Sequence, residues 1–225
     1  MARKRSTGSA QTEPPRLPAQ LPAEEIRAPL SDHASYTRCA LGEGSFVGQE
    51  AEDVLFDQVL ARRLRFNQAR LAHAQLSDAR FDTCDLAEST WTKARMQRVE
   101  WTGCRMVGAV IGEARLDDVR FLRSNGDLAR FWSSTCRRVR FEHCSLRGAS
   151  FEGADLSGAV FLRCDLSEAD FRGAKLQGAD LRGSTIADAQ IGPAELQGAL
   201  IDPAQALLLV GLLGVTVKSE EEGEG

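Results

Sequence analysis

The feature that constrains this chain most is a bulky apolar residue at every fifth position. Steps of five from Tyr36 to Ile201 give 34 positions, here called centres, and 30 of them are bulky apolar or aromatic. The four exceptions are Ala51, Ala61, Gly126 and Cys136. An α-helix repeats its face about every 3.6 residues and a β-strand about every two, so neither regular element explains this period. The period indicates a repeat architecture over most of the chain.

A second position in each pentad is small, and the pentads group in fours. The residue two places before the centre is Ala, Ser, Cys, Gly or Val at 32 of the 34 positions. All ten Phe residues are at centres, and several recur 20 residues apart. One such series is Phe121, Phe141 and Phe161, and another is Phe131, Phe151 and Phe171. This spacing predicts a solenoid with four pentads in each coil, and with the centre and the small residue facing inward.

The segments "ADLSG", "ADFRG", "AKLQG" and "ADLRG" within residues 154–183 resemble the repeats of pentapeptide-repeat proteins. The resemblance covers about three quarters of the chain and is strictest from Ser145 to Ile201. It implies an all-β fold, namely a right-handed quadrilateral parallel β-helix of about eight coils. We also predict a short capping helix at the C-terminal end. Neighbouring coils would pair like strands roughly 4.8 Å apart.

The turn position of the pentad differs between the two halves of the chain. In the second half the residue two places after the centre is often Gly, as at Gly148 and Gly153, and a type II turn needs positive φ there. In the first half this residue is often charged or polar, as at Asp78, Glu88 and Arg98. We therefore expect the turn types to vary along the solenoid.

Four parts of the chain are predicted. Residues 1–30 are expected to be a disordered Pro-rich tail, because they hold five of the seven Pro residues. The solenoid follows over residues 31–201, and residues 202–217 are expected to form a helix and a strand that cap it or join two subunits. Residues 218–225 are expected to be an acidic disordered tail. Asp202 suits the N-cap and Pro203 the first position of the helix.

No targeting or membrane-spanning segment is predicted. The basic start Arg3–Arg5 has no apolar run behind it, so it does not read as a signal peptide. The longest apolar run, residues 204–217, is shorter than the roughly 20 residues that a membrane-spanning helix needs. We therefore expect a protein of the cytoplasm.

The C-terminal helix is apolar on nearly every side, so one face can cover the last coil while another stays exposed. Exposed apolar surface of this kind often contacts a partner. The candidate dimer contacts are Leu207, Leu208, Val210, Leu212 and Leu213. The tail resembles the C-terminal element that joins two subunits in pentapeptide-repeat proteins of the quinolone-resistance type, which implies a homodimer. In the alternative interpretation the chain is a monomer, and the helix only shields the strand edges of the last coil.

Outward-facing arginines are frequent in the first five coils, and a candidate partner-binding patch lies near the middle of the solenoid. Its members are Arg120, Arg123, Trp132, Arg137, Arg138 and Arg140. The patch is close to Gly126, which replaces a bulky centre and predicts a bulge or a small loop. Loops that interrupt a rigid scaffold often carry function. In the alternative interpretation, the arginines pair with neighbouring Asp and Glu on a mixed face.

Four of the six cysteines fall in one column of the predicted solenoid. Cys84, Cys104, Cys144 and Cys164 occupy the small inward position, and Ser124 fills the gap between them. Parallel inward side chains do not form a tetrahedral metal site, and free Cys behaves as a small buried hydrophobe. We expect buried free thiols, in keeping with a reducing compartment.

The sequence gives little support to catalysis. It has only three His residues and no phosphate-binding Gly loop, nucleophile elbow or paired His ligands at metal spacing. We therefore predict a protein that is not an enzyme, with no cofactor and no metal.

Two functional hypotheses remain after the sequence analysis. The first is a scaffold that binds a protein partner through the sides of the solenoid. The second follows from the resemblance, because some pentapeptide-repeat proteins mimic duplex DNA and bind DNA gyrase or topoisomerase IV. Residues 41–201 carry 21 Lys and Arg against 23 Asp and Glu, which departs from the dense negative charge of a mimic. Direct nucleic-acid binding through the arginines is a weaker third hypothesis, and membrane binding is not expected.

Overall fold

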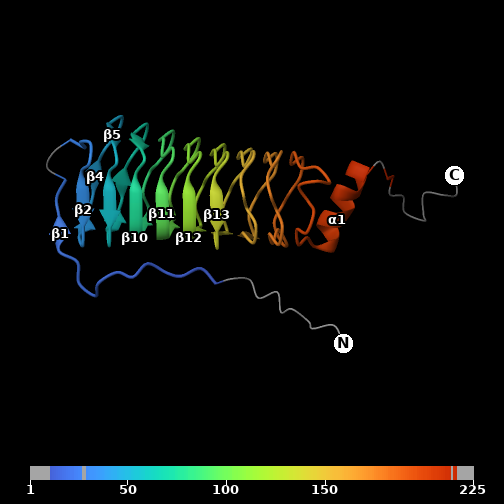
Figure 1. Cartoon of the computed structure of the whole chain (residues 1–225), viewed down its shortest axis with the longest axis horizontal. Coiled ribbons are helices and arrows are strands. Elements are labelled where there is room, and N and C mark those ends of the chain that lie inside the picture. Colours follow the sequence, from blue (N-terminus) through green and yellow to red (C-terminus); the bar gives the residue numbers. More distant parts are fainter. Residues whose placement is uncertain (1–10, 27–28, 214, 217–225) are drawn as a thin grey trace.

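The computed structural model describes residues 11–26, 29–213 and 215–216, and it shows a parallel β-solenoid with one short helix at its C-terminal end (Figure 1). From Ala40 to Leu200, eight successive backbone pairs join residues that are 20 positions apart. The predicted coil of four pentads is therefore confirmed. Coils run in the same direction, so equivalent residues of successive coils form columns along the solenoid.

Fifteen strands, one α-helix and one 3₁₀ helix are assigned within these described residues. The strands are β1 (Ala23–Glu24), β2 (Ser35–Thr37), β3 (Ala40–Leu41), β4 (Gly44–Ser45), β5 (Glu50–Glu52), β6 (Leu55–Asp57), β7 (Leu60–Arg62), β8 (Leu64–Arg65), β9 (Arg70–Ala72), β10 (Gln75–Asp82), β11 (Arg95–Thr102), β12 (Arg115–Leu122), β13 (Thr135–Arg137), β14 (Arg140–Glu142) and β15 (Val160–Leu162). The helices are α1 (Pro203–Leu209) and η1 (Val210–Leu213). The main sheet follows the order β1-β3-β7-β10-β11-β12-β14-β15, and isolated parallel bridges continue the pairing to Leu200.

The core is built from the centres, which stack from coil to coil. All ten Phe residues are buried, as are Trp91 and Trp101. The rings of Phe121 and Phe141 are stacked with centroids 4.7 Å apart, and those of Phe141 and Phe161 lie 4.9 Å apart. Stacked aromatic pairs of this kind contribute about 0.5–1.5 kcal/mol beyond the burial of their area. This explains why Phe recurs at intervals of 20.

The turn position is left-handed in nearly all pentads, whether or not it is Gly, with Glu43 and Pro193 as exceptions. Gly148 has φ 59°, and Asp78 and Glu88 have φ 49° and 58°. Asp78 lies inside the eight-residue strand β10, whereas Glu88 lies in a tight turn. The local structure around the turn position therefore varies along the solenoid, as expected. Non-Gly residues at this position nevertheless keep the positive φ that Gly adopts in the second half.

The expected bulge at Gly126 is absent from the structure. Gly126 is buried, its N–H donates to Ser145 O at 2.7 Å, and its carbonyl accepts from Ala129 N at 3.0 Å. These are the same bonds that ordinary centres make. Leu146 of the next coil approaches within 3.0 Å of the place where a Cβ of Gly126 would stand, so the neighbouring centre occupies this space. The coil therefore passes through Gly126 without interruption.

The expected disordered tail is ordered over residues 11–26. This segment runs along the outside of the coils (Figure 1), and β1 pairs in parallel with β3. Amino-acid composition predicts disorder here, because it contains no information on main-chain N–H groups that form hydrogen bonds with the surface of the solenoid. Residues 1–10 and 27–28 of the predicted tail lie outside the described residues.

Helix α1 covers the last coil, as predicted. Asp202 is its N-cap, and Asp202 and Gln205 form a reciprocal capping box. The buried Gln205 side chain also donates from Nε2 to Leu181 O at 2.6 Å and to Ser184 O at 2.7 Å. These two carbonyls belong to the coil that has no further coil to pair with. The helix thus satisfies part of an open strand edge.

The prediction of a strand after the helix is wrong for residues 215–216, the part of that segment that the structure describes. The chain continues from α1 into η1, and residues 215–216 are not in a strand. A strand would need a free edge, and α1 already covers the end of the solenoid. Val217 and the predicted tail of residues 218–225 lie outside the described residues.

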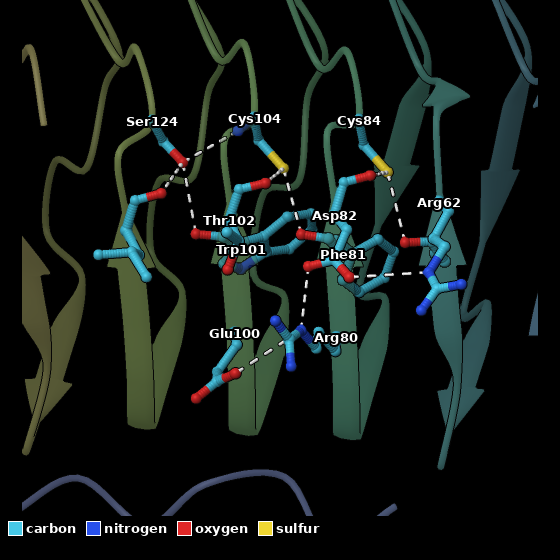
Figure 2. A network of polar contacts seen from close by, with 12 residues as sticks. Arg62, Arg80, Phe81, Asp82, Cys84, Glu100, Trp101, Thr102, Cys104 and Ser124 are labelled. Atoms are coloured by element: carbon cyan, nitrogen blue, oxygen red, sulfur yellow. Dashed lines mark hydrogen bonds and ion pairs between the residues drawn. The ribbon is translucent and has the colours of Figure 1, made fainter. Parts of the chain in front are cut away.

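The column of Cys and Ser residues satisfies inward-facing carbonyl groups (Figure 2). Cys104 Sγ lies 3.4 Å from Phe81 O, and Ser124 Oγ lies 3.3 Å from Trp101 O, so each side chain reaches a carbonyl 23 residues earlier. Ser124 Oγ also accepts from Cys104 N at 3.1 Å. All six cysteines are buried and free. Burial raises the pKa of the Cys136 thiol to about 12, so it stays protonated.

We expect Ser124→Ala to destabilise the solenoid, because it leaves the buried N–H of Cys104 without its acceptor. The expected loss in the free energy of unfolding is about 1–3 kcal/mol. Ser124→Cys is the matched control, since Cys fills this position in both adjacent coils, and a smaller loss is expected. Urea unfolding followed by circular dichroism measures both. Equal losses in the two variants would contradict this role for the hydroxyl group.

Candidate functional site

The predicted arginine patch is largely neutralised by carboxylates. Arg120 and Arg140 are paired neighbours on β12 and β14, and both bind Glu142, with N–O distances of 2.5 Å and 2.8 Å. Burial of Glu142 acts to raise its pKa, but the hydrogen bonds from the two arginines outweigh this and hold the pKa below its ordinary value. Arg138 binds Asp118 through two hydrogen bonds. For these three arginines the mixed-face interpretation fits the structure.

The patch is also divided between different sides of the coil. Arg123 and Arg137 are exposed and form no ion pair with any described residue. Trp132 follows the centre Phe131, and Arg140 precedes the centre Phe141. These two centres are ten residues, or half a coil, apart, so Trp132 and Arg140 lie on opposite sides of the coil. The indole of Trp132 packs over Gly112 of the preceding coil, where an added Cβ would overlap it. The six predicted residues therefore do not form one cluster.

The structure brings together a different set of side chains, which sequence analysis missed. Asp78, Arg98, Asp118 and Arg138 occupy one column of left-handed turn residues in four successive coils, and we call them the ladder. Arg98 donates from Nε and Nη2 to the two carboxylate oxygens of Asp78 at 2.6 and 2.7 Å. Arg138 does the same to Asp118 at 2.7 and 2.6 Å. Such bidentate pairs are strong and fix the plane of the carboxylate.

The ladder is partly buried, because the N-terminal segment lies across it. Only 11% of the Asp78 side chain and 4% of the Asp118 side chain are exposed. The segment of residues 11–18, which we call the arm, runs past these groups in the direction opposite to the order of the coils. Figure 1 shows it beside the strands β10 to β12.

The arm is held mainly through its own main chain. Glu13 N donates to Asp118 Oδ1 at 3.0 Å, and Arg16 N donates to Asp78 Oδ1 at 2.9 Å. Two weaker contacts flank this pair. Thr12 Oγ1 donates to the carbonyl of Arg138 at 3.1 Å, and Gln58 Nε2 donates to the carbonyl of Arg16 at 3.3 Å.

The ladder carboxylates are stabilised in their charged form. The hydrogen bonds from Arg98 and from the Arg16 N–H lower the pKa of Asp78, and those from Arg138 and the Glu13 N–H lower the pKa of Asp118. A group whose pKa is lower in the folded state stabilises that state above its unfolded pKa, which is about 3.9 for Asp. This contribution is lost as the pH falls through the folded pKa values. The attachment of the arm is therefore present at neutral pH.

A groove of about 580 Å³, lined by both polar and apolar residues, separates the arm from the adjacent column of the solenoid. On one side it is lined by the arm residues Gln11, Thr12 and Pro14. On the other side lie Glu100, Arg120, Arg140, Glu142, Val160, Leu162 and Asp180. Two of the predicted arginines, Arg120 and Arg140, thus stand beside the arm.

The C-terminal end presents the apolar surface that the sequence predicted. Leu207 and Leu208 are about two-thirds exposed, Val210 is half-buried, and Leu209 packs against the core. A hollow of about 400 Å³ beside the helix is lined mostly by apolar residues, among them Leu196, Ile201 and Val210. The side chains of Leu212 and Leu213 lie outside the described part of the structure.

His33, His73 and His143 are all exposed. Among the described residues, no three His, Cys, Asp or Glu side chains are grouped so that they could hold a metal ion. No helix in this part of the chain has the length and hydropathy needed to cross a bilayer.

The ladder had a signal in the sequence, whereas the arm had a weaker one. Asp and Arg alternate at positions 78, 98, 118 and 138, one coil apart, and this is visible once the period of 20 is known. The arm docks through main-chain N–H groups that every residue except Pro possesses. Its only sequence signal is the pair Pro14–Pro15 between the two donors.

Comparisons with known proteins find the same repeat. A family model described as "Pentapeptide repeat region" matches residues 94–171, and one described as "Pentapeptide repeats (8 copies)" matches residues 164–200. Comparison with curated protein sequences finds no match.

Solved structures similar to this chain include two proteins of low sequence identity. One is HetL, a pentapeptide repeat protein involved in heterocyst differentiation regulation from the cyanobacterium Nostoc sp. strain PCC 7120. It is 25% identical, with 76% of this chain and 90% of HetL covered and a TM-score of 0.41. The other is full-length QnrB1, a plasmid-mediated fluoroquinolone resistance protein. It is 19% identical, with 81% of this chain and 100% of QnrB1 covered and a TM-score of 0.36.

We expect the double variant Asp78→Asn, Asp118→Asn to release the arm, because the neutral side chains bind neither the arginines nor the arm as strongly. Release should raise the rate of tryptic cleavage after Arg16 at least tenfold at neutral pH. Mass spectrometry of the cleaved chain gives this rate for that bond. Asp117→Asn is the control, since Asp117 is the neighbour of Asp118 on β12 but does not contact the arm. An unchanged rate in the double variant would show that the ladder does not hold the arm.

Proposed function

Since the chain belongs to the pentapeptide-repeat proteins, we propose that it is a non-enzymatic scaffold that binds other proteins through the sides of its solenoid. The observation that carries this proposal is the docked arm. One side of the solenoid already binds an extended polypeptide segment through groups built into its turns. A surface that holds its own chain in this way has the chemistry needed to hold another chain.

The distribution of charge favours a protein partner over mimicry of DNA. A mimic needs dense negative charge to compete for sites that bind phosphates. In this solenoid arginines lie next to carboxylates on several sides, as in the pairs Arg105–Asp85, Arg70–Glu50 and Arg172–Asp170. Binding to DNA gyrase or topoisomerase IV, with an effect on quinolone resistance, is therefore the less supported alternative.

We further propose that the chain forms a homodimer through α1. Leu207 and Leu208 are exposed on a helix whose other side covers the core. The apolar hollow beside the helix continues this surface. Burial of two such leucines would contribute roughly 1.5–3 kcal/mol each.

The scaffold proposal is tested by reversing the charges of Arg123 and Arg137, the two predicted arginines that form no ion pair with described residues. Arg123→Glu with Arg137→Glu is expected to reduce capture of the partner from a lysate of the source cells at least tenfold, because both guanidinium groups are exposed and free of ion pairs with described residues. Arg65→Glu with Lys175→Glu has the same change in net charge at distant coils and serves as the control. Quantitative mass spectrometry of the captured proteins measures the difference.

A parallel assay distinguishes the scaffold from the mimic. The purified chain is added in excess to a bacterial DNA gyrase supercoiling reaction, with and without a quinolone and across a salt series. The scaffold proposal predicts no change in supercoiling. Salt-sensitive inhibition, or protection from the quinolone, would overturn it in favour of the mimic.

The dimer proposal predicts that Leu207→Glu with Leu208→Glu yields monomers, because two carboxylates would be buried in the interface. Light scattering after size-exclusion chromatography gives the mass in solution. Val47→Glu is the control, since Val47 is an exposed apolar residue at the opposite end of the solenoid. A wild-type chain that is already monomeric at high concentration would contradict the proposal.

A further inference from the structure

We propose that the ladder is a binding site for polyproline II segments of the form X-Pro-Pro-X, and that Glu13–Arg16 of this chain is its resident ligand. This rests on the proposed scaffold function and names the chemistry of the segment that the scaffold binds. The segment can come from the same chain or from another protein, because the groups recognised are the same in both.

The spacing of the acceptors selects the conformation of the ligand. The acceptors Asp78 and Asp118 are two coils apart, which is about 9.6 Å at roughly 4.8 Å per coil. The donors Glu13 N and Arg16 N are three residues apart, and a polyproline II helix rises about 9.3 Å over three residues. An α-helix would rise only about 4.5 Å over the same number.

The direction of the donors excludes an ordinary strand. Over three residues a β-strand also spans about 10 Å, but its successive residues face opposite ways, so residues 13 and 16 would point to opposite sides. A polyproline II helix has about three residues per turn, so residues i and i+3 face the same side. In the structure both N–H groups do point to the same column of the solenoid.

The two residues between the donors suit this site because they are prolines. Pro14 and Pro15 have no N–H, so the segment has no donor left unsatisfied between its two anchoring bonds. Their fixed φ and the restriction on the residue before each Pro hold the segment in the extended form before it binds. The loss of conformational entropy on binding is therefore small.

The ladder is built to receive these donors. Each carboxylate is held by two bonds from an arginine of the next coil, and its Oδ1 atom accepts the arm N–H as an additional bond. Among the columns of residues that follow the centres, only this one places carboxylates two coils apart with an arginine between and after them. The site is therefore specific to one corner of the solenoid.

The side chains of Glu13 and Arg16 form no hydrogen bond with the ladder, but their charges complement it, because Arg16 acts on Asp78 and Glu13 acts on Arg98 and Arg138. Glu13 and Arg16 bind each other at 2.8 Å, and their side chains are 55% and 67% exposed. The required features of a ligand are thus two N–H donors separated by two prolines. Any residue other than Pro supplies the N–H group at each X, and an acidic first X with a basic second X also matches the charges of the ladder.

The test uses the full chain with its own donors removed. Glu13→Pro with Arg16→Pro abolishes both N–H groups, while the arm keeps an extended conformation and the solenoid itself is unchanged. A synthetic peptide of residues 10–19 is then titrated into this variant and into the wild type, with isothermal titration calorimetry as the readout. The control peptide carries the same two proline substitutions.

The native peptide should bind the variant at least tenfold more tightly than it binds the wild type, whose tethered arm competes at high effective concentration. The control peptide should bind the variant at least tenfold more weakly than the native peptide. Binding of both peptides with equal affinity, or of neither peptide to either chain, would overturn the proposal. Such a failure leaves the scaffold function to its own test at Arg123 and Arg137, which do not contact the arm.

Discussion

The structure depends on backbone hydrogen bonds that run from each coil to the next. Leu86 N donates to Arg105 O and Asp85 N donates to Leu64 O, so one pentad bonds to the coils before and after it. With a coil of 20 residues, each side chain then stands in a column of equivalents roughly 4.8 Å apart. Stability in such an array comes from neighbouring coils, and the sequence must suit each column as a whole. The Phe stacks, the Cys and Ser column, and the ladder are three solutions to this one constraint.

The same constraint creates a problem at both ends, where carbonyl and N–H groups have no further coil to meet. At the N-terminal end, β1 pairs with β3, and Ile26 packs against the core over Gly44. At the C-terminal end, Gln205 reaches two carbonyls of the last coil. Unprotected edges of this kind would recruit other chains. Residues outside the repeat therefore cover both ends of the solenoid. At the N-terminal end, the same segment that covers the first coil also contains the arm.

The fold was predictable because its information is repeated. Four pentads of five residues specify each coil, even where a single centre is small. For this reason Gly126 does not interrupt the coil. The helix at Asp202 and Pro203 was predictable from local capping chemistry. The strand after it was not, because whether a segment pairs depends on which edges remain free. The arm was missed because proline-rich composition favours disorder unless a surface offers matching acceptors. The predicted arginine patch is not a cluster, because residues close in sequence can face different ways, and Trp132 and Arg140 lie on opposite sides of one coil.

The central claim is that the columns of the solenoid bind an extended segment through its main chain. Amide hydrogen exchange of the full-length chain, resolved by residue with NMR, tests this most directly. The account predicts that the amides of Glu13 and Arg16 exchange at least tenfold more slowly than those of Gln11 and Leu17, because only the first two donate to the ladder. Equal and rapid exchange at all four amides would show that the arm is not bound and would contradict the account.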